Sequence, residues 1–192
     1  MIGKTNSQTG GAIKGEKLNI SLKTNQQNHG DLVGAVITVT HAGGSTEYVW
    51  EGYEITVDVP PYLDYSVSFS EVSGYATPET FASTSVEDNA RAITGTYNTE
   101  IVSVTASADD SASVNGVTIT INGTAHTYSG TVITQKVPFG TQYTVSASAK
   151  TNYAAPSTQT FTAAQASRSV SMVYVASTLT VSISSNQKND TT

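Results

Sequence analysis

The densest group of side chains that could bind a ligand is aromatic. Tyr48, Trp50 and Tyr53 lie close together in the sequence, and exposed aromatic rings can stack on sugars. Trp50 precedes a glycine by two residues, as Tyr128 does, and this shared position favours packing in a core. The three residues are candidate contacts for a carbohydrate, with core packing the favoured interpretation of Trp50.

Patterns for catalysis and metal binding are absent from the sequence. It has no cysteine, nucleophile elbow, phosphate-binding loop or motif of paired acids. The three histidines lack ligand spacing, and the pairs Glu87-Asp88 and Asp109-Asp110 lack the alternating oxygen ligands of a calcium loop. We therefore expect a non-enzymatic protein with no cofactor and no metal site.

The composition predicts an all-β protein. Thr, Ser, Val and Gly are abundant, as in strands and tight turns. The net charge of −6 would repel a phosphate backbone, so nucleic acid is not an expected partner. No segment approaches the roughly 20 apolar residues of a membrane span, and residues 1–17 lack the apolar stretch of a signal peptide.

The sequence contains an internal repeat, and the folded repeats would determine where any site residues lie. Pro60 and Pro138 each follow a valine and precede a tyrosine by five residues, Tyr65 or Tyr143. Near the end of each unit an arginine stands six residues before a tyrosine. Residues 179–189 (LTVSISSNQKN) also resemble residues 18–28 (LNISLKTNQQN), although chance similarity of short strands is the alternative. The predicted organisation is a flexible segment (1–17), two repeats (18–98 and 99–177) and the leading strand of a truncated third repeat (178–192), so we expect a fragment of a longer array.

Each complete repeat should form a seven-stranded, immunoglobulin-like β-sandwich. In the second repeat the expected strands are 101–107, 117–121, 125–129, 132–137, 142–148, 158–163 and 168–174, with turn residues between them. Alternation in 142–148 directs Tyr143 and Val145 inward. Tyr65 and Tyr143 are expected to act as tyrosine corners, each bonded through its hydroxyl to an upstream backbone group, and Pro60 and Pro138 as structural turn residues.

The second repeat resembles a known family pattern. Gly116–Ile121, Val137–Gly140, Tyr143–Val145, Tyr153 and Thr160–Thr162 are similar to PEGA and prealbumin-like (Cna-B-type) repeats of bacterial surface proteins and of phage tail and fibre proteins. The first repeat departs from this pattern, because Pro61-Tyr62-Leu63 replaces Phe139-Gly140-Thr141 and is expected to reshape the turn. Some Cna-B-type modules carry a Lys–Asn isopeptide bond, but the only candidates here, Lys23, Asn98 and Glu71, do not match the family spacing.

The expected role is a spacer or stalk in an extracellular, cell-surface or phage virion protein. Its first partners would be neighbouring repeats of the same chain. A module that binds a cell-surface glycan or protein is the alternative, and an accessory array of a larger enzyme is the third option.

Overall fold

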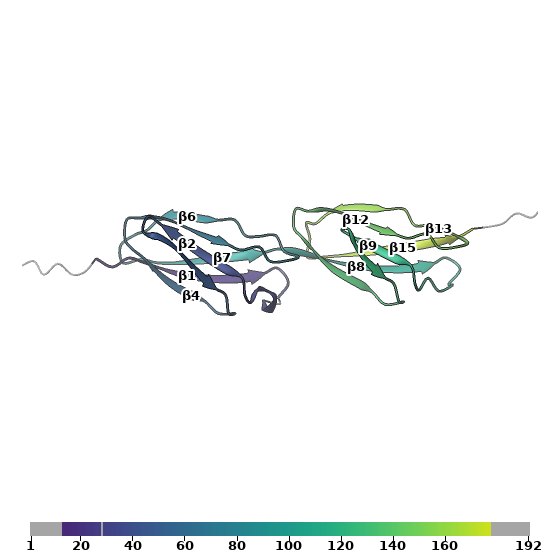
Figure 1. Ribbon diagram of the computed structural model, residues 1–192, viewed down its shortest axis with the longest axis horizontal. Coiled ribbons are helices and arrows are strands. Elements are labelled where there is room, and N and C mark those ends of the chain that lie inside the picture. The colour runs from purple at the N-terminus through teal and green to yellow at the C-terminus, as the bar shows by residue number, and fades with distance from the viewer. Residues whose placement is uncertain (1–12, 28, 178–192) are drawn as a thin grey trace, which may run out of the picture. The chain divides into compact units, whose positions relative to one another are not determined.

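The computed structural model describes residues 13–27 and 29–177, which form the tandem immunoglobulin-like sandwiches expected from the sequence (Figure 1). In the first sandwich one sheet has the order β4-β1-β7 and the other β3-β2-β5-β6. Its strands are β1 (Glu16–Thr24), β2 (Val36–His41), β3 (Gly44–Val49), β4 (Ile55–Val59), β5 (Asp64–Phe69), β6 (Phe81–Thr84) and β7 (Ala90–Tyr97). A short 3-10 helix, η1 (Gly30–Leu32), precedes β2.

The second sandwich contains sheets of the order β11-β8-β15-β13 and β10-β9-β12-β14. Its strands are β8 (Thr99–Ala108), β9 (Thr118–Ile121), β10 (Thr124–Thr127), β11 (Ile133–Pro138), β12 (Gln142–Ala147), β13 (Tyr153–Ala154), β14 (Gln159–Thr162) and β15 (Ser167–Ala176). Each of the seven strands expected there is present. The two-residue β13 is an addition, matched in the first sandwich by a single bridge between Ala76 and Asn98.

The first strand begins inside the segment that was expected to be flexible (1–17). β1 begins at Glu16, because Glu16 pairs with Val59 of β4, and Lys17 then pairs with Asp58 on one side and Ala90 on the other. The expected leading strand of a third repeat lies outside the described residues, and the domain boundaries stay a prediction. In the part of the chain that is described, no helix has the length and apolar character needed to cross a bilayer.

Alternation along the strands builds the cores. In β1 the side chains of Leu18, Ile20 and Leu22 are buried while their neighbours are more exposed, and in β12 Tyr143 and Val145 are buried as expected. One core position differs between the repeats. A Cβ on Gly95 would lie 2.8 Å from both Leu22 Cδ2 and Phe69 Cε1, whereas the equivalent position in β15 holds the buried Met172.

The turn after Pro60 is not reshaped, contrary to the expectation from the sequence. Tyr62 takes a φ of 63°, and Gly140 takes 81° at the same place in the second sandwich. The backbone bonds match as well: Tyr62 N–H donates to Ser85 O (3.1 Å), and Gly140 N–H donates to Ala163 O (2.9 Å). The paired segments on either side hold this turn, so a tyrosine is kept in a backbone region that favours glycine.

Candidate functional site

The three predicted aromatic contacts do not lie together on the surface. Trp50 is 3% exposed and belongs to the first core, as the favoured interpretation of its position expects, and Tyr48 is half-buried against the same core. A ligand contact at Tyr48 or Tyr53 stays a prediction. The backbone N–H and C=O of Trp50 bond to Ala35 and Gly34 across the strand end, which fixes the ring inward. Tyr53 is 63% exposed, and its hydroxyl bonds to the Glu51 carboxylate.

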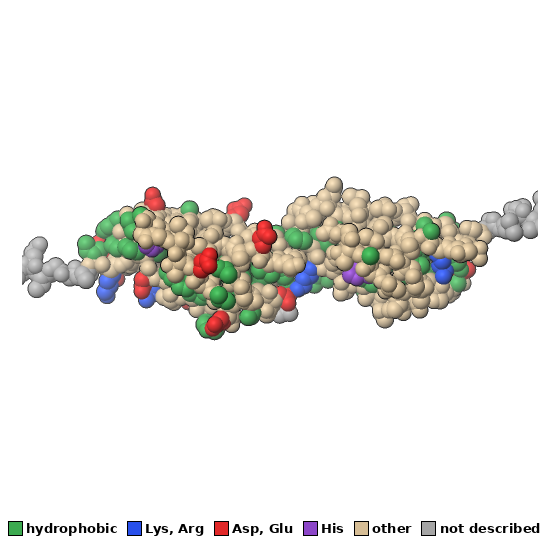
Figure 2. Space-filling model, in the orientation of Figure 1, with side chains coloured by type: hydrophobic (Ala, Val, Ile, Leu, Met, Phe, Trp, Pro, Cys, Tyr) green, Lys and Arg blue, Asp and Glu red, His purple; other side chains and the backbone are tan. Residues whose placement is uncertain are grey.

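The acidic pairs serve turns and strand ends. Asp110 accepts hydrogen bonds from Ala112 N–H (3.0 Å) and the Tyr153 hydroxyl (2.8 Å), and Asp109 accepts one from Ala176 N–H (2.9 Å). Among residues 13–27 and 29–177, no three His, Asp or Glu side chains are grouped so that they could hold a metal ion. Figure 2 likewise shows carboxylates scattered singly over the visible face of the first sandwich.

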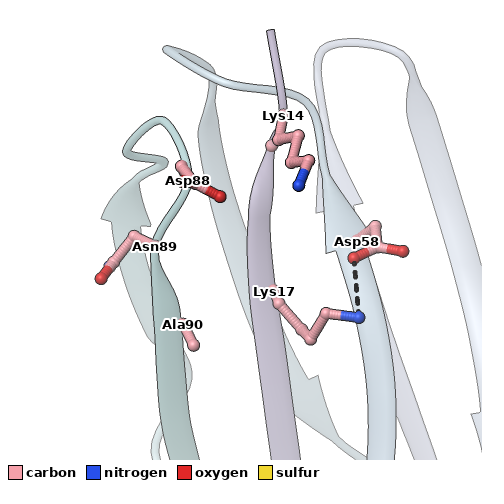
Figure 3. A pocket seen from close by; sticks show the side chains of 7 residues that line it. Lys14, Lys17, Asp58, Asp88, Asn89 and Ala90 are labelled. Atoms are coloured by element: carbon pink, nitrogen blue, oxygen red, sulfur yellow. Dashed lines mark ion pairs between the residues drawn. The ribbon is translucent and has the colours of Figure 1, made fainter. Parts of the chain in front are cut away.

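A surface hollow lies where β1 and β7 begin, and it mixes charges of both signs (Figure 3). Lys17 reaches Asp58 at 3.6 Å on one side of β1, while Asp88 lies on the other side. Both partners of the ion pair are more than half exposed, so the pair contributes little to stability. The hollow shows no convergence of groups on a reacting atom.

The most developed polar cluster in the second sandwich surrounds Glu100, whose side chain is fully buried. Oε1 accepts hydrogen bonds from Arg168 Nε (2.6 Å) and from the Tyr143 hydroxyl (2.6 Å). Oε2 accepts from the backbone N–H groups of Ala164 (3.1 Å) and Gln165 (3.2 Å). Because Glu100 is on β8 and Arg168 on β15, the cluster joins the first long strand of the sandwich to the last.

The first sandwich repeats this cluster with fewer bonds. The buried Glu16 accepts from Asn89 Nδ2 (2.7 Å) and Arg91 Nε (2.9 Å), both through Oε1. Within the described residues, Glu16 Oε2 and the Tyr65 hydroxyl have no hydrogen-bond partner of good geometry. The Glu16 carboxylate nevertheless lies near enough to act on Tyr65: burial, and secondly this charge, raise the pKa of that phenol.

Both carboxylates remain charged at neutral pH. Burial alone would raise the pKa of Glu100, but the bonds from Arg168, Tyr143 and the two backbone N–H groups outweigh it and lower the pKa. Arg91 and Asn89 lower the pKa of Glu16 against the same opposing effect. A buried carboxylate with a lowered pKa is a weak base, so the clusters are suited to holding strands together rather than to proton transfer.

The sequence pointed to part of these clusters. The repeated arginines and Tyr65 and Tyr143 mark the repeat, whereas Glu16 falls in the segment expected to be flexible (1–17) and Glu100 stands near the start of the second repeat without an expected role. A usable signal existed: each glutamate precedes the first inward apolar residue of its strand by two positions, where alternation predicts an inward side chain.

The expected tyrosine-corner bonds are made by other tyrosines. Tyr143 donates to a side chain, not to an upstream backbone group, and Tyr65 makes no such bond, so that detail is wrong. Tyr97 instead donates to Ser70 O (2.7 Å), and Tyr174 donates to Ser148 O (2.6 Å). Each of these ties the last strand of its sandwich to the end of the opposite sheet.

The remaining predicted structural residues lie beside turns: Pro60 directly follows β4, and Pro138 is the last residue of β11. Pro60 O accepts a bond from the Ser85 hydroxyl (2.6 Å), and Pro138 O accepts one from Thr141 N–H (3.2 Å). Lys23 and Glu71 are exposed, and no hydrogen bond or ion pair among the described residues joins them to Asn98.

Comparisons with known proteins give a likeness in fold. No family model and no curated protein matches the sequence. The shaft pilin SpaA of Lactobacillus rhamnosus GG is 11% identical, with a TM-score of 0.41, and the match covers 88% of this chain and 100% of SpaA. The minor pilin GBS52 of Streptococcus agalactiae is 10% identical (TM-score 0.44; 89% and 100% covered). The Bacillus anthracis TIE protein is 15% identical (TM-score 0.40), and the match covers 85% of this chain but only 34% of that protein.

Proposed function

We propose that this chain is a non-enzymatic spacer or stalk region of a bacterial surface or phage virion protein. The observation that carries the proposal is the parallel pairing of β1 with β7. Because the first and last strands of the sandwich run in the same direction, the chain enters at one end and leaves at the other. Each such module therefore adds its own length, roughly 25 Å along the paired strands, to the path of the chain.

The surface and the cores support the same role. Each sandwich has its own buried apolar residues, so a module can be repeated without a shared core. Within the described residues, no cluster of titratable groups opens onto a hollow with the geometry of a catalytic site. The buried Trp50 removes the observation that favoured glycan binding.

The test of a spacer is its length. Small-angle X-ray scattering should show a larger maximum dimension when residues 99–177 are duplicated in tandem, by about the length of one module. An unchanged maximum dimension would contradict the proposal.

A glycan array probed with the full chain tests the alternative, and binding that is lost in Tyr53→Ala would establish a ligand site on the exposed aromatic residue. Antibodies raised against the chain should label intact cells or virions, since a spacer lies outside the surface that it projects from.

A further inference from the structure

The terminal strands of the first sandwich are paired along nearly their whole length. The register runs through eight residue pairs, from Lys17 with Ala90 to Thr24 with Tyr97. Tension along the chain would pull β1 from its Glu16 end and β7 from its Tyr97 end. These ends lie at opposite ends of the pairing, so the load would act along the strands as shear.

Shear and peeling load the same hydrogen bonds differently. In a parallel pair the bonds are evenly spaced along the strands, and sliding one strand past the other strains all of them together. Pulling the two strands apart from one end breaks the bonds one after another. A shear load therefore has to overcome a larger barrier to forced unfolding, which is governed by the unfolding rate.

Each loaded strand is also anchored at the end where it would be pulled. On β1, the buried Glu16 is bonded to Asn89 and Arg91, and sliding would draw Leu18 and Ile20, both 0% exposed, out of the core. On β7, the Tyr97 ring is fully buried and its hydroxyl bonds to Ser70 O, at the end of the opposite sheet. Slippage must break these polar contacts and expose apolar side chains to water.

We propose that the β1–β7 pair is a mechanical clamp, with Glu16 and Tyr97 as its anchors, which makes the first sandwich resist tension applied through the chain. The clamp deepens the proposed spacer function and rests on it, because only a protein that is held at both ends experiences such a load. No ligand or partner is needed for the clamp to act.

Single-molecule force spectroscopy on the full chain can separate the two geometries. The chain has no cysteine, so pairs of cysteines can define where the handles attach. Lys14→Cys with Asn98→Cys loads the pair in shear, and Lys14→Cys with Ala90→Cys peels it from one end. At equal pulling speed the shear geometry should rupture at a force at least about twofold higher, because its bonds share the load. Equal rupture forces in the two geometries would overturn the clamp.

Variants of the anchors add a second readout. Tyr97→Phe removes the bond to Ser70 at the end remote from the peeling point, so it should lower the shear rupture force and leave the initial peeling force unchanged. A general loss of stability would lower both forces, and that result would count against the anchor. Tyr62→Phe is the matched control, since this hydroxyl is exposed and bonds to Glu87 outside the clamp. Fluorescence of Trp50 verifies that each variant is folded before pulling.

The two proposals fail separately. If the duplicated chain is longer but shear and peeling forces agree, the spacer stands and the clamp is wrong. If shear forces are higher but duplication adds no length, the clamp stands as a property of the fold and the spacer role is wrong.

Discussion

Arg168 Nε lies 2.6 Å from Glu100 Oε1, inside a cluster whose carboxylate is fully buried. This pair closes β15 against β8, and Arg91 with Glu16 does the same for β7 and β1 at 2.9 Å. Both carboxylates occupy inward positions that alternation would normally give to apolar side chains. Once a charge is buried there, its partners become essential, because removing one of them leaves the other unpaired away from water.

Glu100→Gln should therefore lower the free energy of unfolding of the second sandwich by about 3–5 kcal/mol, since Arg168 loses its counter-charge. Glu16→Gln should cost less, about 1–3 kcal/mol, because Glu16 has fewer bonds and Arg91 is more exposed. Denaturant titration separates the two effects: Trp50, the only tryptophan, reports the first sandwich, and circular dichroism reports both. A shift of the Trp50 transition in Glu100→Gln as large as in Glu16→Gln would contradict this assignment.

Acid should destabilise the second sandwich through Glu100. Its folded pKa is lower than the ordinary value, so the folded state binds fewer protons than the unfolded state over that range. The stabilisation is complete above the unfolded pKa, about 4.3, and is lost as the pH falls through the folded pKa. The denaturant midpoint of unfolding is measured at several pH values between 2 and 7. Below about pH 4.3 it should fall less steeply with decreasing pH in Glu100→Gln than in the native chain. If the midpoint depends on pH equally in both proteins, another group carries the acid sensitivity.

Tyr65 and Tyr143 occupy equivalent positions, but the loss of the hydroxyl group should change stability differently at each. Tyr143→Phe removes a donor to a buried carboxylate and should cost about 1.5–3 kcal/mol. Tyr65→Phe should be near neutral or slightly stabilising, because its buried hydroxyl has no partner of good geometry among the described residues. Urea unfolding of both variants is the measurement. Equal costs would mean that the Tyr65 hydroxyl is bonded in solution.

The equivalent turns at Tyr62 and Gly140 allow the cost of a positive φ to be measured. Tyr62→Gly should raise the stability of the first sandwich, since glycine adopts a φ near 63° without steric cost. Gly140→Ala should lower that of the second by roughly 1–2 kcal/mol for the converse reason. Thermal melts followed by Trp50 fluorescence and circular dichroism assign each change to its sandwich. A less stable Tyr62→Gly protein would show that the side chain contributes more than its backbone costs.

The sequence by itself determined the architecture. Alternation in segments such as 142–148 fixed which side chains face inward, because a slip of one residue would bury hydroxyl groups. The equal spacing of Pro60 with Tyr65 and of Pro138 with Tyr143 fixed the repeat. These signals are local, so they can be read from residues that are near one another in the chain.

Only the tertiary structure decided which side chains meet. Arg168 is 68 residues from Glu100, and no local pattern predicts that the strands carrying them become neighbours in one sheet. The left-handed backbone of Tyr62 also depends on a paired segment distant in sequence, because its N–H bonds to Ser85 O. Pairing between strands distant in sequence determines which side chains are buried and which groups they bond to. It can override the local preference of a residue, because the free energy of many weak contacts together exceeds the cost of one strained backbone position or one buried charge.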